Sequence, residues 1–321
     1  MVMRLSGMLA ASAVVGAGIS YWLVRRSDTT TGASGHSTVD VASKKNATFK
    51  PSYDGVKENI NTIMDRYGHP GPSADYFARD VYALSYNRAT RNAHWVSEYL
   101  TRDTFIDSSN DENKESDGPD RNKSKFKEEK AVPEQFRSKL SDYAGSGFDR
   151  GHLAPAADVK ESQNAIDETF ILSNISPQVA KGFNRGYWAQ VERFVRSLTK
   201  TFDQVVVTTG PLFLPTQDED GKYWVKYQLL GDPGNTAVPT HFFKVIVATV
   251  KNQTFAQAFV LPNQVIQDSP PLTDYIVPVE YIERMSGLLL YPNLQIKTLP
   301  PLCERVTCVV KAFKEVLKNK K

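Results

Sequence analysis

The spacing of apolar positions divides the chain into expected strands and helices. Four runs between residues 205 and 261 are rich in β-branched and aromatic side chains and predict successive strands of one mixed sheet. These runs are 205–210, 223–230, 241–248 and 255–261. Residues 82–100 predict a β-hairpin with a polar turn, and the apolar triplet 170–172 predicts a buried strand. Short helices are expected at 162–168 and 279–285, so the predicted fold class is α+β.

A helical spacing dominates the stretch that follows residue 183. Large apolar side chains recur there at three- and four-residue steps and predict an amphipathic helix from about residue 184 to residue 200. These apolar positions are Phe183, Tyr187, Val191, Phe194, Val195 and Leu198. A polar stripe places Asn184, Glu192 and Arg196 at multiples of four residues, so the three side chains are expected to point from one face.

Residues 1–26 predict a targeting segment that contacts a membrane. No charged residue occurs from Leu5 to Val24, and this run is long enough to cross a hydrocarbon layer as a helix. A cleaved secretory signal and a buried helix of the fold are the alternatives. The pair Arg25-Arg26 resembles a stop-transfer flank, and the lack of acidic residues before Asp28 suits mitochondrial import. We therefore expect a mitochondrial membrane anchor.

Two polar stretches interrupt the apolar pattern. Residues 27–50 have almost no large apolar side chain and predict a flexible linker, so the folded domain is expected at 51–321. Residues 102–130 are mostly Ser, Asn, Asp, Glu and Lys of mixed sign. They predict a charged, at least partly disordered insertion, with a substrate-facing flap as the alternative.

The amino-acid composition argues against several classes of protein. A hydrophobic content of 40% with 11% aromatic residues is enough for a core, which argues against a disordered chain. The net charge of +3 is compatible with a polyanionic partner without identifying one. Cys303 and Cys308 have no partners at zinc-ligand spacing, which argues against a structural zinc site. We interpret them as half-buried thiols, with a local disulfide as the alternative in an oxidising compartment.

Candidate chemistry is concentrated in residues 149–152, Asp-Arg-Gly-His, where a strand is expected to run into a loop. Alone, this tetrapeptide also fits a surface turn with an ion pair and a solvated histidine. A Glu192–Arg196 pair on a wet helix face is equally ordinary, but it leaves Asn184 unexplained. An amide oxygen, a carboxylate and a nearby histidine together suit a hard divalent cation, so magnesium fits better than zinc.

Three ordered motifs carry a resemblance to a known family. The tetrapeptide 149–152 is followed by Leu-Ser-Asn-Ile-Ser-Pro-Gln at 172–178, and then by Asn184 with Trp188, Glu192 and Arg196 at four-residue steps. This order resembles the DNA/RNA non-specific endonuclease family, and within it the mitochondrial endonuclease G group with its fungal members. The resemblance runs from about Pro51 to the C-terminus. It implies a ββα-metal core, or His-Me finger, on a mixed, mostly antiparallel sheet with flanking helices.

The resemblance implies roles for three residues around a cation. His152 matches the general base that deprotonates the attacking water, and Asn184 matches the single direct protein ligand to Mg²⁺, for which Mn²⁺ is expected to substitute. Glu192 would bind the same cation through water. This division is physically reasonable because a neutral imidazole is a usable base near pH 7, and a divalent cation can neutralise charge on the scissile phosphate.

Five further residues receive supporting roles from the resemblance. Arg150 and Arg196 would bind phosphate oxygens with their guanidinium groups, and Arg91 is a further candidate for substrate binding. Asp149 and Asn174 would orient the base or its loop without reacting themselves.

The activity that the resemblance implies is magnesium-dependent hydrolysis of DNA and RNA to 5′-phosphate and 3′-hydroxyl ends. No residue of this set reads base edges, so cleavage is expected to ignore sequence and to weaken with salt. A 5′ exonuclease of the same fold and a catalytically silent nucleic-acid-binding scaffold are the alternatives. The resemblance also implies a homodimer, anchored in the mitochondrial inner membrane and facing the intermembrane space.

Overall fold

The computed structural model describes residues 58–310 except 73 and 106–118. These residues belong to one unit, 48–321, of the two into which the chain divides. Within the described residues no helix is long and apolar enough to span a bilayer. The predicted anchor, the linker and the lysine-rich C-terminal end lie outside the described residues.

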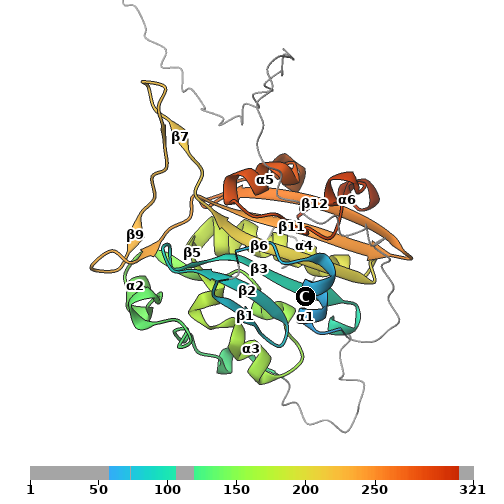
Figure 1. The fold of residues 1–321 in the computed structure, drawn as a ribbon, viewed down its shortest axis with the longest axis horizontal. Helices are drawn as coiled ribbons and strands as arrows, with labels where there is room; N and C mark the ends of the chain where they lie inside the picture. Colours follow the sequence, from blue (N-terminus) through green and yellow to red (C-terminus); the bar gives the residue numbers. More distant parts are fainter. Residues whose placement is uncertain (1–57, 73, 106–118, 311–321) are drawn as a thin grey trace, which may run out of the picture. The chain divides into compact units, whose positions relative to one another are not determined.

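A six-stranded sheet forms the centre of the unit, and every neighbouring pair of strands is antiparallel (Figure 1). In spatial order the strands are β1 (Tyr76–Ala78), β2 (Tyr82–Asn87), β3 (Asn92–Thr101), β6 (Gln204–Leu212), β11 (His241–Val250) and β12 (Gln253–Pro262). The predicted hairpin and three of the four predicted sheet strands are confirmed. The expectation of a mixed sheet was wrong, because each connection returns the chain in the opposite direction.

Helices cover both faces of this sheet. One face packs against α4 (Ala189–Leu198), where Val191, Trp188 and Phe242 belong to one apolar core. The other face packs against α1 (Ile60–Tyr67) and α5 (Val279–Ser286), with Ile63 and Ile282 in a second core. Every residue of β6 is buried, which explains its nearly continuous apolar sequence.

Local capping groups fix one end of each helix on the second face. The side chain of Asn59 accepts a hydrogen bond from the Thr62 amide and caps the start of α1. Gly287, at φ 72°, ends α5 in the left-handed conformation that glycine tolerates best, and the helix predicted at 279–285 is confirmed.

A separate pair of strands lies at one side of the sheet. β4 (Phe148–His152) and β5 (Ile175–Val179) are antiparallel and place His152 opposite Ile175. The strand predicted at 170–172 was wrong, because these residues end α3 (Gln163–Thr169) and enter a 3-10 turn, η6 (Leu172–Asn174). β5 instead runs through Pro177, which a two-stranded ribbon tolerates at an unpaired N–H position.

The predicted strand at 223–230 does not join the central sheet. Only β8 (Tyr223–Trp224) and β9 (Leu229–Leu230) are strands, paired with β7 (Thr216–Gln217) and β10 (Thr236–Ala237) in two short ribbons. The β7–β8 hairpin projects from the sheet as an arm (Figure 1). The two ends of the predicted segment are strands, but they pair in the short ribbons and not with the central sheet.

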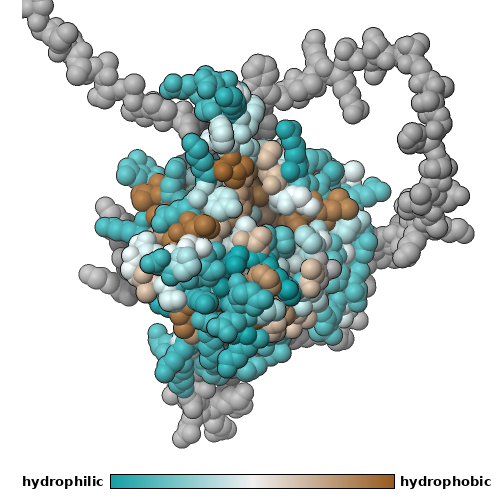
Figure 2. Space-filling view, turned by 60° about the vertical axis from the view of Figure 1, so that its left-hand side comes forward, coloured by the Kyte–Doolittle hydropathy of each residue, from teal (hydrophilic) through white to brown (hydrophobic). Residues whose placement is uncertain are grey.

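The arm exposes large apolar and aromatic side chains. Tyr223 is 70% exposed and Trp224 48%, and Val225, Tyr227 and Leu229 are exposed with them. Figure 2, turned so that this side comes forward, shows hydrophobic residues on the surface below a hydrophilic tip. Isolated exposed apolar residues are ordinary, but a group of them on a projecting hairpin favours an interaction surface.

Part of the predicted insertion is ordered. Residues 119–130 are described, and Lys127 forms a β-bridge with Ile171. Within this part, Glu129 is buried and accepts hydrogen bonds from Arg79 and Ser173. The prediction of disorder therefore fails for these residues, because their few polar and aromatic anchors bind neighbouring elements. Residues 106–118 lie outside the described part.

The prediction of free thiols was wrong. Cys303 and Cys308 form a disulfide at the end of α6 (Leu302–Arg305). The remaining described helices are short turns: η1 (Asp103–Phe105), η3 (Arg121–Lys123), η4 (Glu134–Phe136), α2 (Leu140–Tyr143), η5 (Ala156–Asp158), η8 (Leu272–Tyr275) and η9 (Ile296–Thr298).

Candidate active site

His152 ends β4 and lies in a closely packed turn. A Cβ atom at the preceding residue, Gly151, would come within 2.1 Å of Gln178 Oε1 on β5. Glycine is therefore needed here for close approach of the two strands rather than for a flexible hinge. The backbone before the histidine is held by this contact.

Asn174 holds the backbone that follows the histidine. Its fully buried side chain accepts a hydrogen bond from the Ala154 amide and donates to the Ala154 and Thr169 carbonyls, each at 2.9 Å. With three hydrogen bonds to backbone groups, the amide clamps the turn at residues 152–154 against the end of α3. The geometry therefore gives Asn174 a positioning role.

The His152 ring is enclosed by aromatic side chains. It is 8% exposed, and its centroid lies 4.7 Å from that of Phe170 and 5.6 Å from that of Phe126. Its Nε2 atom is buried without a hydrogen-bond partner in the described part of the chain. Burial, assisted by the positive charge of Arg121, lowers the pKa of His152 to about 3. The imidazole is therefore neutral near pH 7 and can accept a proton.

Asp149 connects β4 to the segment that carries Asn184. Its Oδ2 atom accepts hydrogen bonds from Asn184 Nδ2 and from Arg185 Nε, both at 2.8 Å. Because Nδ2 of Asn184 is bound in this way, its amide oxygen points away from Asp149 and keeps its lone pairs for a cation.

The predicted helix from 184 to 200 is broken. The irregular helical segment η7 (Ala180–Trp188) contains non-helical backbone at Lys181, Gly182, Arg185 and Gly186, and regular helix begins with α4 at Ala189. The proposed alignment of Asn184 with Glu192 and Arg196 on one continuous helix face was therefore wrong. Asn184 is placed by its bond to Asp149, while Glu192 and Arg196 share a face of α4.

Arg196 binds an acid that the sequence spacing did not indicate. Its Nη1 atom donates to Oδ1 of Asp158 at 2.5 Å, and the Asp158 side chain is almost fully buried. Asp158 lies in the η5 turn that follows His152, so this ion pair joins α4 to the histidine loop. The Glu192–Arg196 pair that was the ordinary alternative does not form among the described residues, and Arg196 has less freedom to reach a phosphate than expected.

Glu192 is half-buried and receives no hydrogen bond from any residue between 58 and 310 that the structure describes. Burial raises its pKa to about 7, against the opposing effect of Lys244 and with a further contribution from Asp158. A carboxylate that lacks donors in a partly dry site suits water molecules or a cation as partners.

This raised pKa predicts a pH dependence of stability in metal-free buffer. Unfolding returns Glu192 to its ordinary pKa of 4.5, so between pH 4.5 and about 7 the folded protein keeps a proton that the unfolded chain releases. The contribution of Glu192 to stability therefore falls as pH rises through this window. We expect Glu192→Gln to remove this part of the slope of Tm against pH, measured with EDTA. Identical slopes for the two proteins would contradict the prediction.

The two remaining predicted arginines are not equivalent. Arg150 is exposed, with its guanidinium carbon 4.6 Å from the centroid of Phe126, which leaves its N–H groups free for an anion. Arg91 lies at the β2–β3 turn and donates to the Ala89 and Gln135 carbonyls. None of these hydrogen bonds connects Arg91 to another predicted site residue.

Two residues of the ordered insertion were missed by sequence reasoning. Phe126 forms one wall of the histidine site. Arg121, in η3, is exposed, and its charge acts on both His152 and Glu192. Phe126 could have been recognised because it is an aromatic residue within a polar stretch. Arg121 could not, because the insertion contains several other charged residues.

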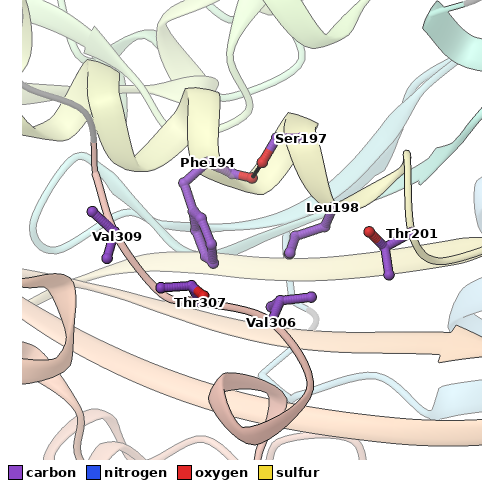
Figure 3. Close-up of a pocket in the computed structure, with 7 residues that line it drawn as sticks. All are labelled: Phe194, Ser197, Leu198, Thr201, Val306, Thr307 and Val309. Atoms are coloured by element: carbon purple, nitrogen blue, oxygen red, sulfur yellow. Dashed lines mark hydrogen bonds between the residues drawn. The ribbon is translucent and has the colours of Figure 1, made fainter. Parts of the chain in front are cut away.

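A pocket of about 310 Å³ lies on the opposite side of α4 (Figure 3). Phe194, Ser197, Leu198 and Thr201 line it from α4 and the turn after it, and Val306, Thr307 and Val309 line it from the C-terminal segment. The helical period places these α4 residues opposite Glu192 and Arg196, so the pocket is separate from the polar site.

Comparisons with known proteins identify the family of the chain. A family model described as DNA/RNA non-specific endonuclease matches residues 60–295. Nuclease C1 of Cunninghamella echinulata var. echinulata is 51% identical over 253 residues, which cover 78% of this chain and 96% of the relative. The mitochondrial nuclease of Saccharomyces cerevisiae is 41% identical over 317 residues, which cover 95% of this chain and 90% of the relative.

A solved structure confirms the fold class. The crystal structure of the EndoG/EndoGI complex matches with a TM-score of 0.68 and 42% identity, over 74% of this chain and 94% of that chain. The α+β fold and its ββα unit, formed by β4, β5 and the helical residues up to α4, are those that the resemblance implied. With a family model that covers most of its folded part and relatives of this identity, the chain belongs to the DNA/RNA non-specific endonuclease family.

Proposed function

We propose that this nuclease hydrolyses the phosphodiester bonds of DNA and RNA in a magnesium-dependent reaction, with His152 as general base and Asn184 as the direct protein ligand to the cation. The observation that carries the proposal is the buried, neutral His152 ring with a free Nε2 atom. Family membership supports the substrate class.

The donor set fits a cation that retains most of its water. In the described residues no group of three or more His, Cys, Asp and Glu side chains is arranged to hold a metal ion. The Asn184 amide oxygen, oriented by Asp149, would be the direct ligand, and the unpaired Glu192 carboxylate would bind through water. Such a sparse oxygen set is typical of Mg²⁺ and permits Mn²⁺. When bound, the cation supplies positive charge to the phosphate and to the leaving oxygen.

His152 would move the proton in this reaction. A water oxygen forms a bond to phosphorus while the bond from phosphorus to the 3′ oxygen breaks, and Nε2 takes the proton that the water loses. The products are a 5′-phosphate and, once the 3′ oxygen is protonated, a 3′-hydroxyl group. The negative charge of the bound phosphate raises the basicity of the imidazole above that in the free protein.

Arginines would bind the substrate without reading its sequence. Arg150 has free guanidinium N–H groups beside the histidine, and Arg121 adds positive charge on the same side. Arg196, held by Asp158, and Arg91, held by backbone carbonyls, would contribute positive charge from more constrained positions. Contacts to phosphates alone predict cleavage that ignores sequence and weakens with salt.

Replacing Arg121 tests the part of this surface that lies in the insertion. We expect Arg121→Ala to raise KM and to reduce the slope of log(kcat/KM) against log salt by about one unit, because one phosphate contact is lost. Lys125→Ala, which removes another charge from the same segment, is the matched control. Equal salt slopes for Arg121→Ala and the unchanged protein would exclude a phosphate contact.

The decisive experiment uses a circular plasmid and a single-stranded RNA. The purified protein should cut both with magnesium, should lose activity in EDTA and should regain it when magnesium is restored. Cutting of the circle excludes a purely exonucleolytic enzyme. Binding of the plasmid without cleavage at any magnesium concentration would instead support the silent scaffold and overturn the proposal.

We infer a homodimer from the family resemblance and from the exposed aromatic side chains of the arm. Light scattering of Trp224→Ala should show a loss of dimer if the arm joins two copies. A monomeric unchanged protein would contradict the inference.

We further propose that the protein lies in the mitochondrial inner membrane and faces the intermembrane space. The Saccharomyces cerevisiae relative is described as mitochondrial, and residues 5–24 carry no charge. Protease protection of the tagged protein in mitochondria and in mitoplasts tests this location. Recovery of the protein from the culture medium would overturn it.

A further inference from the structure

Five ionisable side chains share the buried space between α4 and the central sheet. Glu98 comes from β3, Lys244 from β11, Asp158 from η5, and Glu192 and Arg196 from α4. Glu192 and Arg196 belong to the proposed reaction. The other three are more deeply buried, at 4% exposure for Glu98, 3% for Asp158 and 0% for Lys244.

Burial of three ionisable side chains together needs a physical reason, since an unpaired charge in a core is strongly destabilising. Lys244 donates to Thr209 Oγ1 at 2.7 Å, and its Nζ atom lies 5.0 Å from the centroid of the Trp188 ring. Neither partner carries a charge. The ammonium must therefore be balanced by the carboxylates that surround it.

The Asp158 carboxylate reveals where a proton lies. Its Oδ1 atom binds Arg196, while its Oδ2 atom is buried without a fixed donor among the described residues. The Glu98 carboxyl group lies within hydrogen-bond reach of Asp158. Two carboxyl groups can share a hydrogen bond only when one of them is protonated. Burial raises the pKa of both carboxyl groups, that of Glu98 well above its usual value, while the Arg196 guanidinium opposes the rise at Asp158.

A protonated Glu98 balances the charge of the group. Above about pH 7, where Glu192 is ionised, Asp158 and Glu192 then carry two negative charges, and Arg196 and Lys244 carry two positive charges. Lys244 and Asp158 also act on Glu98, and Lys244 has the largest Coulombic effect on Glu192. The group therefore links Glu192 and Arg196 electrostatically to residues of two sheet strands and of the histidine loop.

We propose that Glu98, Asp158 and Lys244 are positioning residues of the nuclease site. Protonated Glu98 donates to Asp158 and holds it against Arg196, while the buried ammonium of Lys244 attracts the Glu192 carboxylate and fixes its side chain. This inference rests on the proposed function, because it assigns these three residues to the support of Glu192 and Arg196.

The matched test makes the same change of acid to amide at the two contacting carboxyl groups. Glu98→Gln keeps a neutral donor toward Asp158, so kcat should fall less than in Glu98→Leu, which removes the donor. Asp158→Asn removes the charge that holds Arg196, so kcat should fall about 10–100-fold, with a smaller change in KM. Lys244→Met should lower kcat, and Lys244→Arg should restore a large part of the loss.

Infrared spectroscopy provides a readout that does not depend on activity. Well above pH 7, where Glu192 is ionised, the unchanged protein should show a protonated carboxyl band that is lost in Glu98→Gln and that shifts but persists in Asp158→Asn. Equal loss of kcat in the two amide variants, full activity of Asp158→Asn, or persistence of the band in Glu98→Gln would overturn the inference. If the unchanged protein lacks magnesium-dependent cleavage, the proposed function fails, and the infrared comparison still decides the arrangement.

Discussion

Replacing His152 by alanine is expected to lower kcat for plasmid cleavage about 10²–10⁴-fold, the usual contribution of a positioned general base. The ring is buried, and its Nε2 atom has no partner in the described part of the chain, so the substitution removes the proposed proton acceptor. KM should change little, because phosphate binding depends on the arginines. Initial rates over a range of plasmid concentrations with saturating magnesium separate the two constants.

A matched control comes from another histidine of the same domain. His94 is half-buried at the start of β3 and belongs to none of the contacts that form the site. We expect His94→Gln to retain near-normal activity. Thermal unfolding of both variants checks that the loss in His152→Ala is chemical. Full activity of a folded His152→Ala protein would remove His152 from the mechanism.

The second large effect is expected from Asn184→Ala, which should lower activity at least about 100-fold at low magnesium, since loss of a direct ligand should cost no less than loss of an outer-shell partner. Higher magnesium should recover part of the loss. Isothermal titration calorimetry of magnesium should show weaker binding in the variant, independently of turnover. Unchanged affinity for magnesium would show that Asn184 is not the ligand.

Asn184→Asp separates the ligand from its orientation. The variant keeps an oxygen for the cation but cannot donate to Asp149, and it places two carboxylates together. We expect tighter magnesium binding than in Asn184→Ala but incomplete recovery of kcat. Recovery of full activity would show that the bond to Asp149 has no role in positioning.

The central fold was predictable because burial leaves a local signature. β6 and β11 are covered on both faces, so nearly every position is apolar or small, and such runs are recognisable without a partner. The segment 223–230 shows the limit of this signal. Its side chains favour extended backbone, but their exposure depends on what packs against them, which sequence alone does not contain.

The sequence identified which residues form the candidate site better than it predicted how they are arranged in space. Ordered motifs identified His152 and Asn184, but the non-helical backbone at Gly186 is a tertiary feature that helical spacing hides. The partner of Arg196 was missed for a similar reason. Asp158 is distant in sequence, and a helical spacing rule considers only Glu192.

The contact between Phe126 and His152 has a consequence for how this enzyme could change by insertion and deletion. The charged stretch from 102 to 130 has one end built into the histidine site, through Phe126 and through the backbone bonds of Lys127 to Phe170 and Leu172. A change of length beside Phe126 would therefore displace a wall of the site, and a reporter peptide for protein engineering should not be inserted there.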